Sequence, residues 1–259
     1  MWYTRNFIRA SGLLKILQQF VLLLFLFLKL FHYFNHIYKM KPITSFNRLL
    51  TIFLIFIAGL IIARIVYSEN IRYISLAWNI FLAWIPYILS CFFSDYRAKE
   101  KWKQFFLFAS WLLFFPNALY IVTDLIHLEE ATHVPLWYDA VLLFASSFIG
   151  IMMAFVSLQK AEYLLNGFFS KRIVMALIPL ILFLASFGVY LGRFQRWNSW
   201  DVIHNPLALG IDILSRFVSP VDHMKTWAIT IIFTALYSLL YFLVKIIPQA
   251  LAENKTAGE

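Results

Sequence analysis

The chain has 259 residues, of which 62% are hydrophobic and only 14% are charged, and its formal net charge is +9. About a quarter of the residues in a soluble domain are charged, so this composition excludes an ordinary soluble protein and indicates a polytopic membrane protein in a lipid bilayer. The basic residues are spread over several loops and form no single patch, so the charge does not indicate a nucleic-acid partner. The single cysteine, Cys91, can form no internal disulfide.

An apolar run near the N-terminus, residues 20–31, follows three basic residues. It resembles the first two regions of a signal peptide, but no small-residue cleavage site follows it. Residues 1–39 are therefore interpreted either as an extra N-terminal hydrophobic helix or as an over-extended start. A seventh span would leave positive charge on both sides of the membrane, so we expect the core to begin near Met40.

Six apolar stretches are each about as long as the roughly twenty residues that cross a hydrocarbon core. They lie at residues 49–67, 71–93, 104–122, 137–157, 173–191 and 226–247. The predicted fold class is all-α, a polytopic transmembrane helical bundle of six core spans, with or without the extra N-terminal helix. We expect one membrane-embedded core domain over residues 40–247 and a cytoplasmic polar tail at 248–259. The loop 192–225 is the longest polar stretch and is too short to form an independent core.

Basic residues are concentrated in alternate loops along the chain. Basic loops at residues 39–48, 94–103 and 158–172 contrast with the loop 123–136, which has no lysine or arginine. By the positive-inside rule the basic loops are cytoplasmic, and both ends of the core are predicted to be inside. The predicted outer side carries the arginines Arg64, Arg72, Arg193, Arg196 and Arg216. Because the arginine fork suits carboxylate or phosphate, this set indicates an anionic ligand, internal pairing with Asp and Glu, or interfacial anchoring.

The third span turns polar at its outer end without losing its helical spacing. Its polar residues would lie on one face of a continuous helix, at i, i+3, i+7 and i+10: Asn117, Tyr120, Asp124 and His127. Ordinary spans end in Lys, Arg, Trp or Tyr anchors, so an amide, a phenol, a carboxylate and an imidazole in one stripe indicate a binding or catalytic site. The alternative is an interfacial cap that leads into a solvated loop.

Other spans carry polar residues to the same predicted outer face. Asn79 lies in the outer third of the second span, where a buried amide needs a partner, and Tyr138 and Asp139 open the fourth span. The exit of the fifth span supplies Arg193, Arg196, Trp197, Asn198, Trp200 and Asp201. Clusters from segments distant in sequence are better evidence for a site than any one cluster. The alternative is that these polar ends hold the helices together through buried ion pairs.

Several chemistries can be compared with these residues. Asp124 and His127, together with Asp139, His133 or Glu130, could bind a divalent metal, although no HExxH motif and no cysteine pair is present. A carboxylate could activate a histidine or a water, but no GxSxG turn supplies a nucleophile and no glycine-rich loop supplies a phosphate site. For transport, Arg64 is the main ionisable candidate within a span, and no inverted repeat of hydropathy is visible. The sequence identifies no cofactor, protein partner or oligomeric state.

Three strings carry a resemblance to a known family: FFPNALYIVTDLIHL at 114–128, WYDAVLLF at 137–144 and YLGRFQRWNSWDVI at 190–203. In this order and spacing they resemble the signature segments of a bacterial family of membrane proteins, domain of unknown function 1361. The resemblance covers roughly residues 49–246. It implies a multi-span fold in the bacterial inner or plasma membrane, and it implies no catalytic residue.

Two functional hypotheses and one structural alternative follow. The first is a site, open to the extracytoplasmic leaflet, that binds or modifies an anionic lipid or lipid-linked headgroup. Arg193 and Arg196 would hold the anion, and Asp124, His127 and Asp139 are candidate acid, base or metal ligands. The second is a transporter or permease component in which the same residues form an outer vestibule. The structural alternative is a non-catalytic membrane assembly protein. We expect Asp124 and Arg193 to serve the site rather than to form a buried structural pair.

Overall fold

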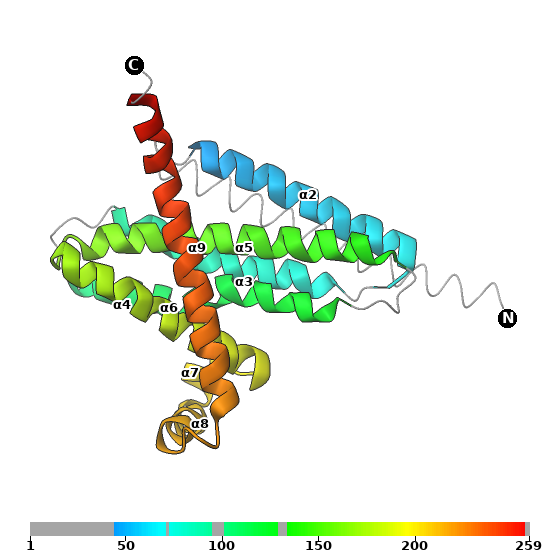
Figure 1. Ribbon diagram of the computed structural model, residues 1–259. Helices are drawn as coiled ribbons and strands as arrows, with labels where there is room; N and C mark the ends of the chain where they lie inside the picture. Colours follow the sequence, from blue (N-terminus) through cyan, green and yellow to red (C-terminus); the bar gives the residue numbers. More distant parts are fainter. Residues whose placement is uncertain (1–43, 71–72, 95–100, 129–133, 257–259) are drawn as a thin grey trace. The chain divides into compact units, whose positions relative to one another are not determined.

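The computed structural model describes residues 44–70, 73–94, 101–128 and 134–256, and every regular element in these ranges is helical (Figure 1). The elements are α2 (Thr44–Ser68), α3 (Ile74–Cys91), η1 (Phe92–Ser94), α4 (Lys101–Tyr120), η2 (Ile121–His127), α5 (Leu136–Leu165), α6 (Lys171–Phe194), α7 (Asp201–His204), α8 (Pro206–Val218) and α9 (Met224–Thr256). The all-α prediction is confirmed.

Six of these helical segments are long and apolar enough to cross a membrane. They are Ser45–Ser68, Ile74–Cys91, Trp102–His127, Leu136–Leu165, Lys171–Phe194 and Met224–Pro248. The six predicted spans are therefore confirmed, each with its ends shifted by a few residues. The proposed N-terminal helix and the start near Met40 lie outside the described residues. Past the last span, α9 continues as a helix to Thr256, through most of the predicted polar tail.

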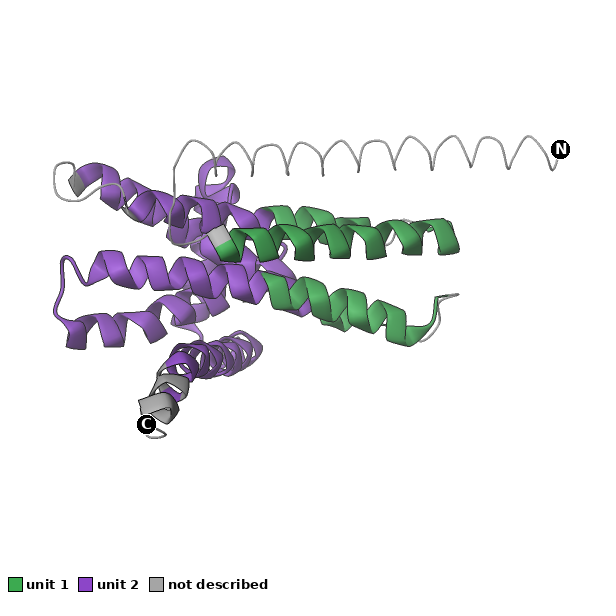
Figure 2. Cartoon of the chain, turned by 90° about the horizontal axis from the view of Figure 1, so that it is seen from above, with its two compact units in different colours: residues 1–81, 124–149 green, residues 82–123, 150–259 purple. Residues whose placement is uncertain are grey.

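The chain divides into two compact units, which Figure 2 distinguishes by colour. Unit 1 comprises residues 1–81 and 124–149, and unit 2 comprises residues 82–123 and 150–259. Unit 1 thus contains α2, the first part of α3, the end of η2 and the first part of α5. Unit 2 contains the rest of α3 and α5, with α4 and α6 to α9.

In unit 1, α2 packs on α5 through one apolar face. The buried residues of α2 recur at intervals of three and four: Leu50, Leu54, Ile57, Ile61 and Ile65. This spacing places them on one side of a helix. The rings of Phe53 and Phe148 lie 6.0 Å apart and mark the contact with α5. The remaining large apolar side chains of α2, such as Ile52 and Phe56, are exposed, as lipid-facing side chains are.

In unit 2, α6 packs against α4 and α9. The contact with α4 is close because Gly188 faces Pro116: a Cβ atom at position 188 would lie 2.7 Å from the Pro116 Cγ atom. Gly150 of α5 has the same role against the end of α4, because a Cβ there would lie 2.9 Å from the carbonyl oxygen of Ala118. Small residues allow helices to approach closely in membranes, where apolar surface alone does not drive association.

The polar end of the third span is not one continuous α-helix. It changes at Ile121 into the 3₁₀ helix η2, in which three residues make a turn. The Thr123 hydroxyl donates to the carbonyl oxygen of Tyr120 at 2.6 Å, across the point where the winding changes. The expected single face is therefore corrected: Asn117 and Tyr120 belong to α4 in unit 2, whereas Asp124 and His127 belong to η2 in unit 1.

The loop predicted at 192–225 also has more structure than expected. It contains the short helix α7 and the 13-residue helix α8. Leu209 of α8 is buried in a cluster with Phe187, Tyr190 and Leu191 of α6, and Trp227 of α9 packs against the same cluster. The connector between α6 and α9 is therefore anchored on both spans.

Candidate functional site

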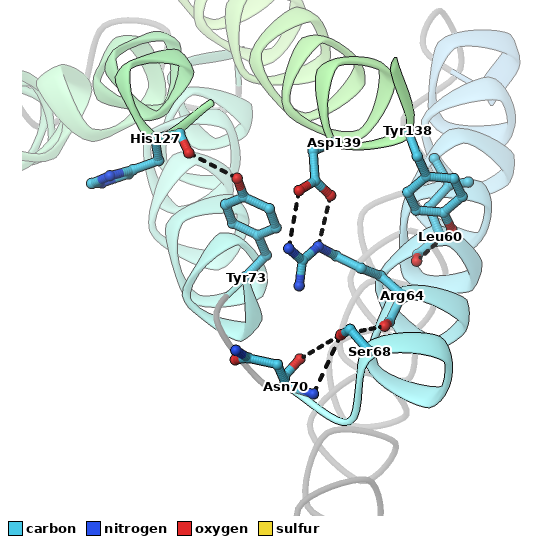
Figure 3. Close-up of polar contacts among 8 residues, drawn as sticks. All are labelled: Leu60, Arg64, Ser68, Asn70, Tyr73, His127, Tyr138 and Asp139. Carbon is cyan, nitrogen blue, oxygen red and sulfur yellow. Dashed lines mark hydrogen bonds and ion pairs between the residues drawn. The ribbon is translucent and has the colours of Figure 1, made fainter. Parts of the chain in front are cut away.

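A buried ion pair joins α2 to α5 in unit 1 (Figure 3). The Arg64 Nε atom donates to Asp139 Oδ1 at 2.7 Å, and Nη2 donates to Oδ2 at 3.0 Å. The two side chains are only 2% and 0% exposed. Arg64 lies four residues before the end of α2, and Asp139 lies three residues after the start of α5. The pair is therefore about one helical turn, or about 5 Å, inside the ends of both spans.

The ring of Tyr73 packs against the Arg64 guanidinium. The Arg64 Cζ atom lies 4.2 Å from the centroid of the Tyr73 ring, a cation–π distance. The Tyr73 hydroxyl donates to the carbonyl oxygen of His127 at 2.9 Å. Tyr73 immediately precedes α3, so this ring connects the arginine of α2 to the backbone of η2 (Figure 3).

One edge of the Arg64 guanidinium is not used. Its Nη1 atom is buried and has no hydrogen-bond partner among the described residues. Nη1 points away from Asp139, to the side where Ser68 and Asn70 lie (Figure 3). There the Ser68 hydroxyl donates to the Arg64 carbonyl oxygen at 2.7 Å, and Glu69 has a left-handed φ of 50° that ends α2. A buried donor left unsatisfied costs about 1–3 kcal/mol, and more if charged, so Nη1 marks a place for an acceptor.

A second buried carboxylate, Asp124, lies in the same unit. The Asn79 Nδ2 atom donates to Asp124 Oδ2 at 2.7 Å, which joins α3 to η2. Asp124 is buried, so this amide supplies part of the hydrogen bonding that a buried carboxylate requires. The expectation that Asn79 needs a partner is met by Asp124.

The remaining unit 1 candidates lie close to these two contacts. Tyr138 precedes Asp139, and its hydroxyl donates to the carbonyl oxygen of Leu60 at 2.8 Å, so it fixes α5 against α2 beside the ion pair. The imidazole of His127 is exposed, while its carbonyl oxygen accepts from Tyr73. Asp139 has both carboxylate oxygens engaged by Arg64, which suits a positioning role better than proton transfer.

In unit 2, Arg193 holds the end of α4. Its Nη1 atom donates to the Tyr120 hydroxyl and its Nη2 atom donates to the Thr123 carbonyl oxygen, both at 3.1 Å. Asn117 is on the same helix, and its Nδ2 atom donates to Ser199 Oγ at 3.2 Å. Ser199 in turn donates to the carbonyl oxygen of Leu113 at 3.3 Å. Three candidates, Asn117, Tyr120 and Arg193, thus make hydrogen bonds at the C-terminal end of α4.

The other candidates of unit 2 organise the connector after α6. Trp197 Nε1 donates to Asp212 Oδ2 at 2.7 Å, and the Asn198 backbone N–H donates to Asp201 Oδ2 at 2.6 Å. Arg196 is exposed and has a left-handed φ of 62°, and Trp200 is also exposed. These residues shape the turn into α7 and α8.

In the part of the chain that the structure covers, the candidate metal ligands do not form a complete set. Within it, no group of three or more His, Cys, Asp or Glu side chains could hold a metal ion. Glu130 and His133, which the sequence offered as further ligands, lie outside the described residues. The convergence of all three polar segments on one site stays a prediction, because the candidates divide between the two units.

Sequence reasoning missed several partners. It selected Arg64 for transport but did not pair it with Asp139, and it gave no role to Tyr73, Ser199 or Asp212. Tyr73 has the position of an ordinary interface anchor, so only its contacts distinguish it. Arg64 and Asp139 both occur about one turn inside a span end, and this matching depth was the signal available.

Comparison with known proteins supports the resemblance found in the sequence. A family model described as a protein of unknown function, DUF1361, matches residues 78–240, from α3 to α9. The match includes Asn79, Asp124 and Asp139, and begins after Arg64 and Tyr73. No curated protein and no solved structure matches the chain.

Proposed function

We propose that this chain, which belongs to the DUF1361 family of proteins of unknown function, is a multi-span membrane protein that binds the phosphate-bearing headgroup of a lipid or lipid-linked molecule. The observation that carries the proposal is the unused edge of Arg64, a buried donor whose Nη1 atom has no partner among the described residues. The site is formed by Arg64, Tyr73 and Asp139, with Asn79 and Asp124 nearby in unit 1.

The chemistry of the pair favours phosphate oxygen as the acceptor. Asp139 occupies Nε and Nη2, so the guanidinium keeps its planar orientation and presents Nη1 in a fixed direction. Arginine recognises phosphate through such oriented N–H groups, and a buried guanidinium is less costly to dehydrate than an ammonium. The position of Arg64, about one turn inside a span end, is the depth at which headgroups meet acyl chains.

The location supports binding at a membrane face rather than passage through the membrane. Transport sites usually lie near the bilayer midplane, whereas Arg64 and Asp139 lie near span ends.

We propose that this face is extracytoplasmic, because the basic loops 94–103 and 158–172 follow the opposite span ends. We also propose the bacterial inner membrane as its place, as the resemblance implies. If the bound headgroup is modified, Asp124 and His127 are the candidate catalytic residues, and they share unit 1 with Arg64.

Retention of phospholipid through gentle purification tests the proposal. Wild-type protein purified in a mild detergent and analysed by native mass spectrometry should keep a phospholipid after detergent exchange. Arg64→Lys, which keeps the charge but loses the third donor edge, should reduce that retention at least tenfold. Arg48→Lys is the matched control, because Arg48 is an exposed arginine at the opposite end of the same helix.

Re-addition to delipidated protein distinguishes the sources of the phosphate. Phosphatidylglycerol alone would indicate an anionic headgroup, and equal binding of phosphatidylcholine would indicate the phosphodiester itself. Equal retention by wild type, Arg64→Lys and Arg48→Lys would overturn the proposal. Should Arg64→Lys fold poorly, Arg64→Gln/Asp139→Asn offers a second variant, which keeps a hydrogen-bonded pair without the guanidinium.

A structural role is the second candidate, and the two-point contact between Arg64 and Asp139 favours it. In a membrane assembly protein the pair would hold α2 on α5 without any ligand. The two readings differ in the lipid measurement, since a purely structural pair predicts no bound headgroup. Substrate flux into liposomes without headgroup retention would instead favour a transporter component.

A further inference from the structure

Helix α8 of unit 2 exposes a continuous apolar stripe. Leu207, Ile211, Leu214 and Val218 are 80%, 68%, 63% and 79% exposed. Their spacing of four, three and four residues places them on one line along the helix. The two buried residues of α8, Leu209 and Arg216, lie on the opposite side.

The polar residues of α8 face the protein, the reverse of a helix on a soluble surface. Asp212 accepts from Trp197 Nε1 at 2.7 Å and forms an ion pair with Arg216 one turn later. The Arg216 guanidinium lies 5.7 Å from the ring centroid of Tyr190 in α6. The Trp227 Nε1 atom of α9 donates to the Arg216 carbonyl oxygen at 3.3 Å. The charged side chains therefore face the protein, where Asp212 contacts Trp197 and Arg216, and the apolar side chains are left outside.

These contacts fix the depth of α8 relative to the two spans it connects. Tyr190 lies four residues before the end of α6, and Trp227 lies three residues after the start of α9. Each contact is thus within about 6 Å of a span end. A helix of 13 residues is about 20 Å long, too short to cross a hydrocarbon core of about 30 Å.

We propose that α8 is an interfacial helix whose outward stripe inserts into the acyl chains of the leaflet where α6 ends and α9 begins. Depth, length and inverted polarity together match helices that lie in the plane of the bilayer, with the apolar face about 5–10 Å into the acyl boundary. A second copy of the chain fits less well. A stripe of four side chains exposes on the order of a few hundred Å², whereas a standard interface buries about 800 Å² on each partner.

Fluorescence quenching by spin-labelled lipids tests this inference. Single-cysteine variants are made in a Cys91→Ser background, labelled with a nitrobenzoxadiazole dye and reconstituted into phosphatidylcholine nanodiscs. The dye introduced through Leu214→Cys should emit at shorter wavelength than one in water and be quenched more by lipid with the nitroxide at acyl carbon 5 than at carbon 12. Two control positions bracket it: Asp222→Cys, exposed in the turn after α8, and Leu239→Cys, exposed near the middle of α9.

The controls make each outcome decisive. Asp222→Cys should show water-like emission without quenching, and Leu239→Cys should be quenched most at carbon 12. The proposal is overturned if Leu214→Cys behaves as Asp222→Cys does, which would place the stripe in water. It is equally overturned if Leu214→Cys forms disulfide-linked dimers in nanodiscs that hold two copies and is shielded from both nitroxides, because a second chain would then cover the stripe.

Discussion

Arg64 and Asp139 are 75 residues apart in sequence, yet they form a buried two-point ion pair that joins α2 to α5. The pair leaves the third edge of the guanidinium buried and without a partner among the described residues. A structural contact and a potential ligand contact therefore reside in the same side chain. The contribution of Arg64 to the stability of the protein and its contribution to ligand binding can be measured separately.

Removing one partner of this pair should strongly destabilise the protein. Arg64→Met or Asp139→Leu alone leaves an uncompensated buried charge, and each should lower the free energy of unfolding by about 3–5 kcal/mol. The double variant should recover most of the loss, because no lone charge remains. Thermal unfolding in detergent micelles measures this, with Arg48→Met as the exposed control. Simple addition of the two single losses in the double variant would show that the pair is not energetically coupled.

The contact between Asn79 and Asp124 predicts different results for two substitutions. Asn79→Leu removes a hydrogen bond to a buried carboxylate and should cost about 1.5–3 kcal/mol. Asp124→Asn keeps one acceptor oxygen for the Asn79 amide, so it should lower the melting temperature less than Asn79→Leu does. Denaturant or thermal unfolding of both variants checks this. An Asn79→Leu variant as stable as the wild type would show that the contact contributes nothing.

Much of the fold was predictable from the sequence, because span length and hydropathy depend on local composition. The positions of the polar residues along their spans were predictable too, because Asn79, Asp124 and Asp139 all occur near span ends. Which helix face meets which neighbour was not, because the pairing of Arg64 with Asp139 depends on how α2 is rotated against α5. The stripe from Asn117 to His127 failed as a single face because the helix changes from α to 3₁₀ winding at Ile121.

The helix α8 was missed for a related reason. Its 13 residues fall below the length of a span, and Asp212 and Arg216 gave the segment the composition of a loop. The spacing of Leu207, Ile211 and Leu214 was nevertheless visible in the sequence. Only the contacts of the Asp212 and Arg216 side chains show that the polar side faces inward.

Close helix packing at Gly188 can be tested against another helical glycine. Gly188→Ala should destabilise the protein by about 1–3 kcal/mol, because the new Cβ atom would lie 2.7 Å from the Pro116 ring. Gly59→Ala is the matched control on α2, since a Cβ there meets nothing within 4 Å. Its stability should be unchanged or raised by up to about 1 kcal/mol through better helix propensity. Equal effects of the two substitutions would contradict the packing described for α4 and α6.

The proposed orientation predicts which loops are reached from outside the cell. In a Cys91→Ser background, a membrane-impermeant maleimide should label Thr132→Cys in intact cells. Lys101→Cys should be labelled only after the membrane is permeabilised, because its basic loop is expected to be cytoplasmic. Labelling in the opposite order would invert the topology and place the Arg64 end of the bundle in the cytoplasm.

The most direct test of headgroup binding is a cryo-electron microscopy map of the protein in nanodiscs formed from native membrane, at a resolution that defines side chains. We predict non-protein density about 2.7–3.2 Å from Arg64 Nη1, continuous with acyl-chain density, while Nε and Nη2 stay on Asp139. The same density should be missing from the map of the Arg64→Lys variant. A wild-type map in which Nη1 is bonded to another protein side chain, or to water alone, would contradict the proposed headgroup site.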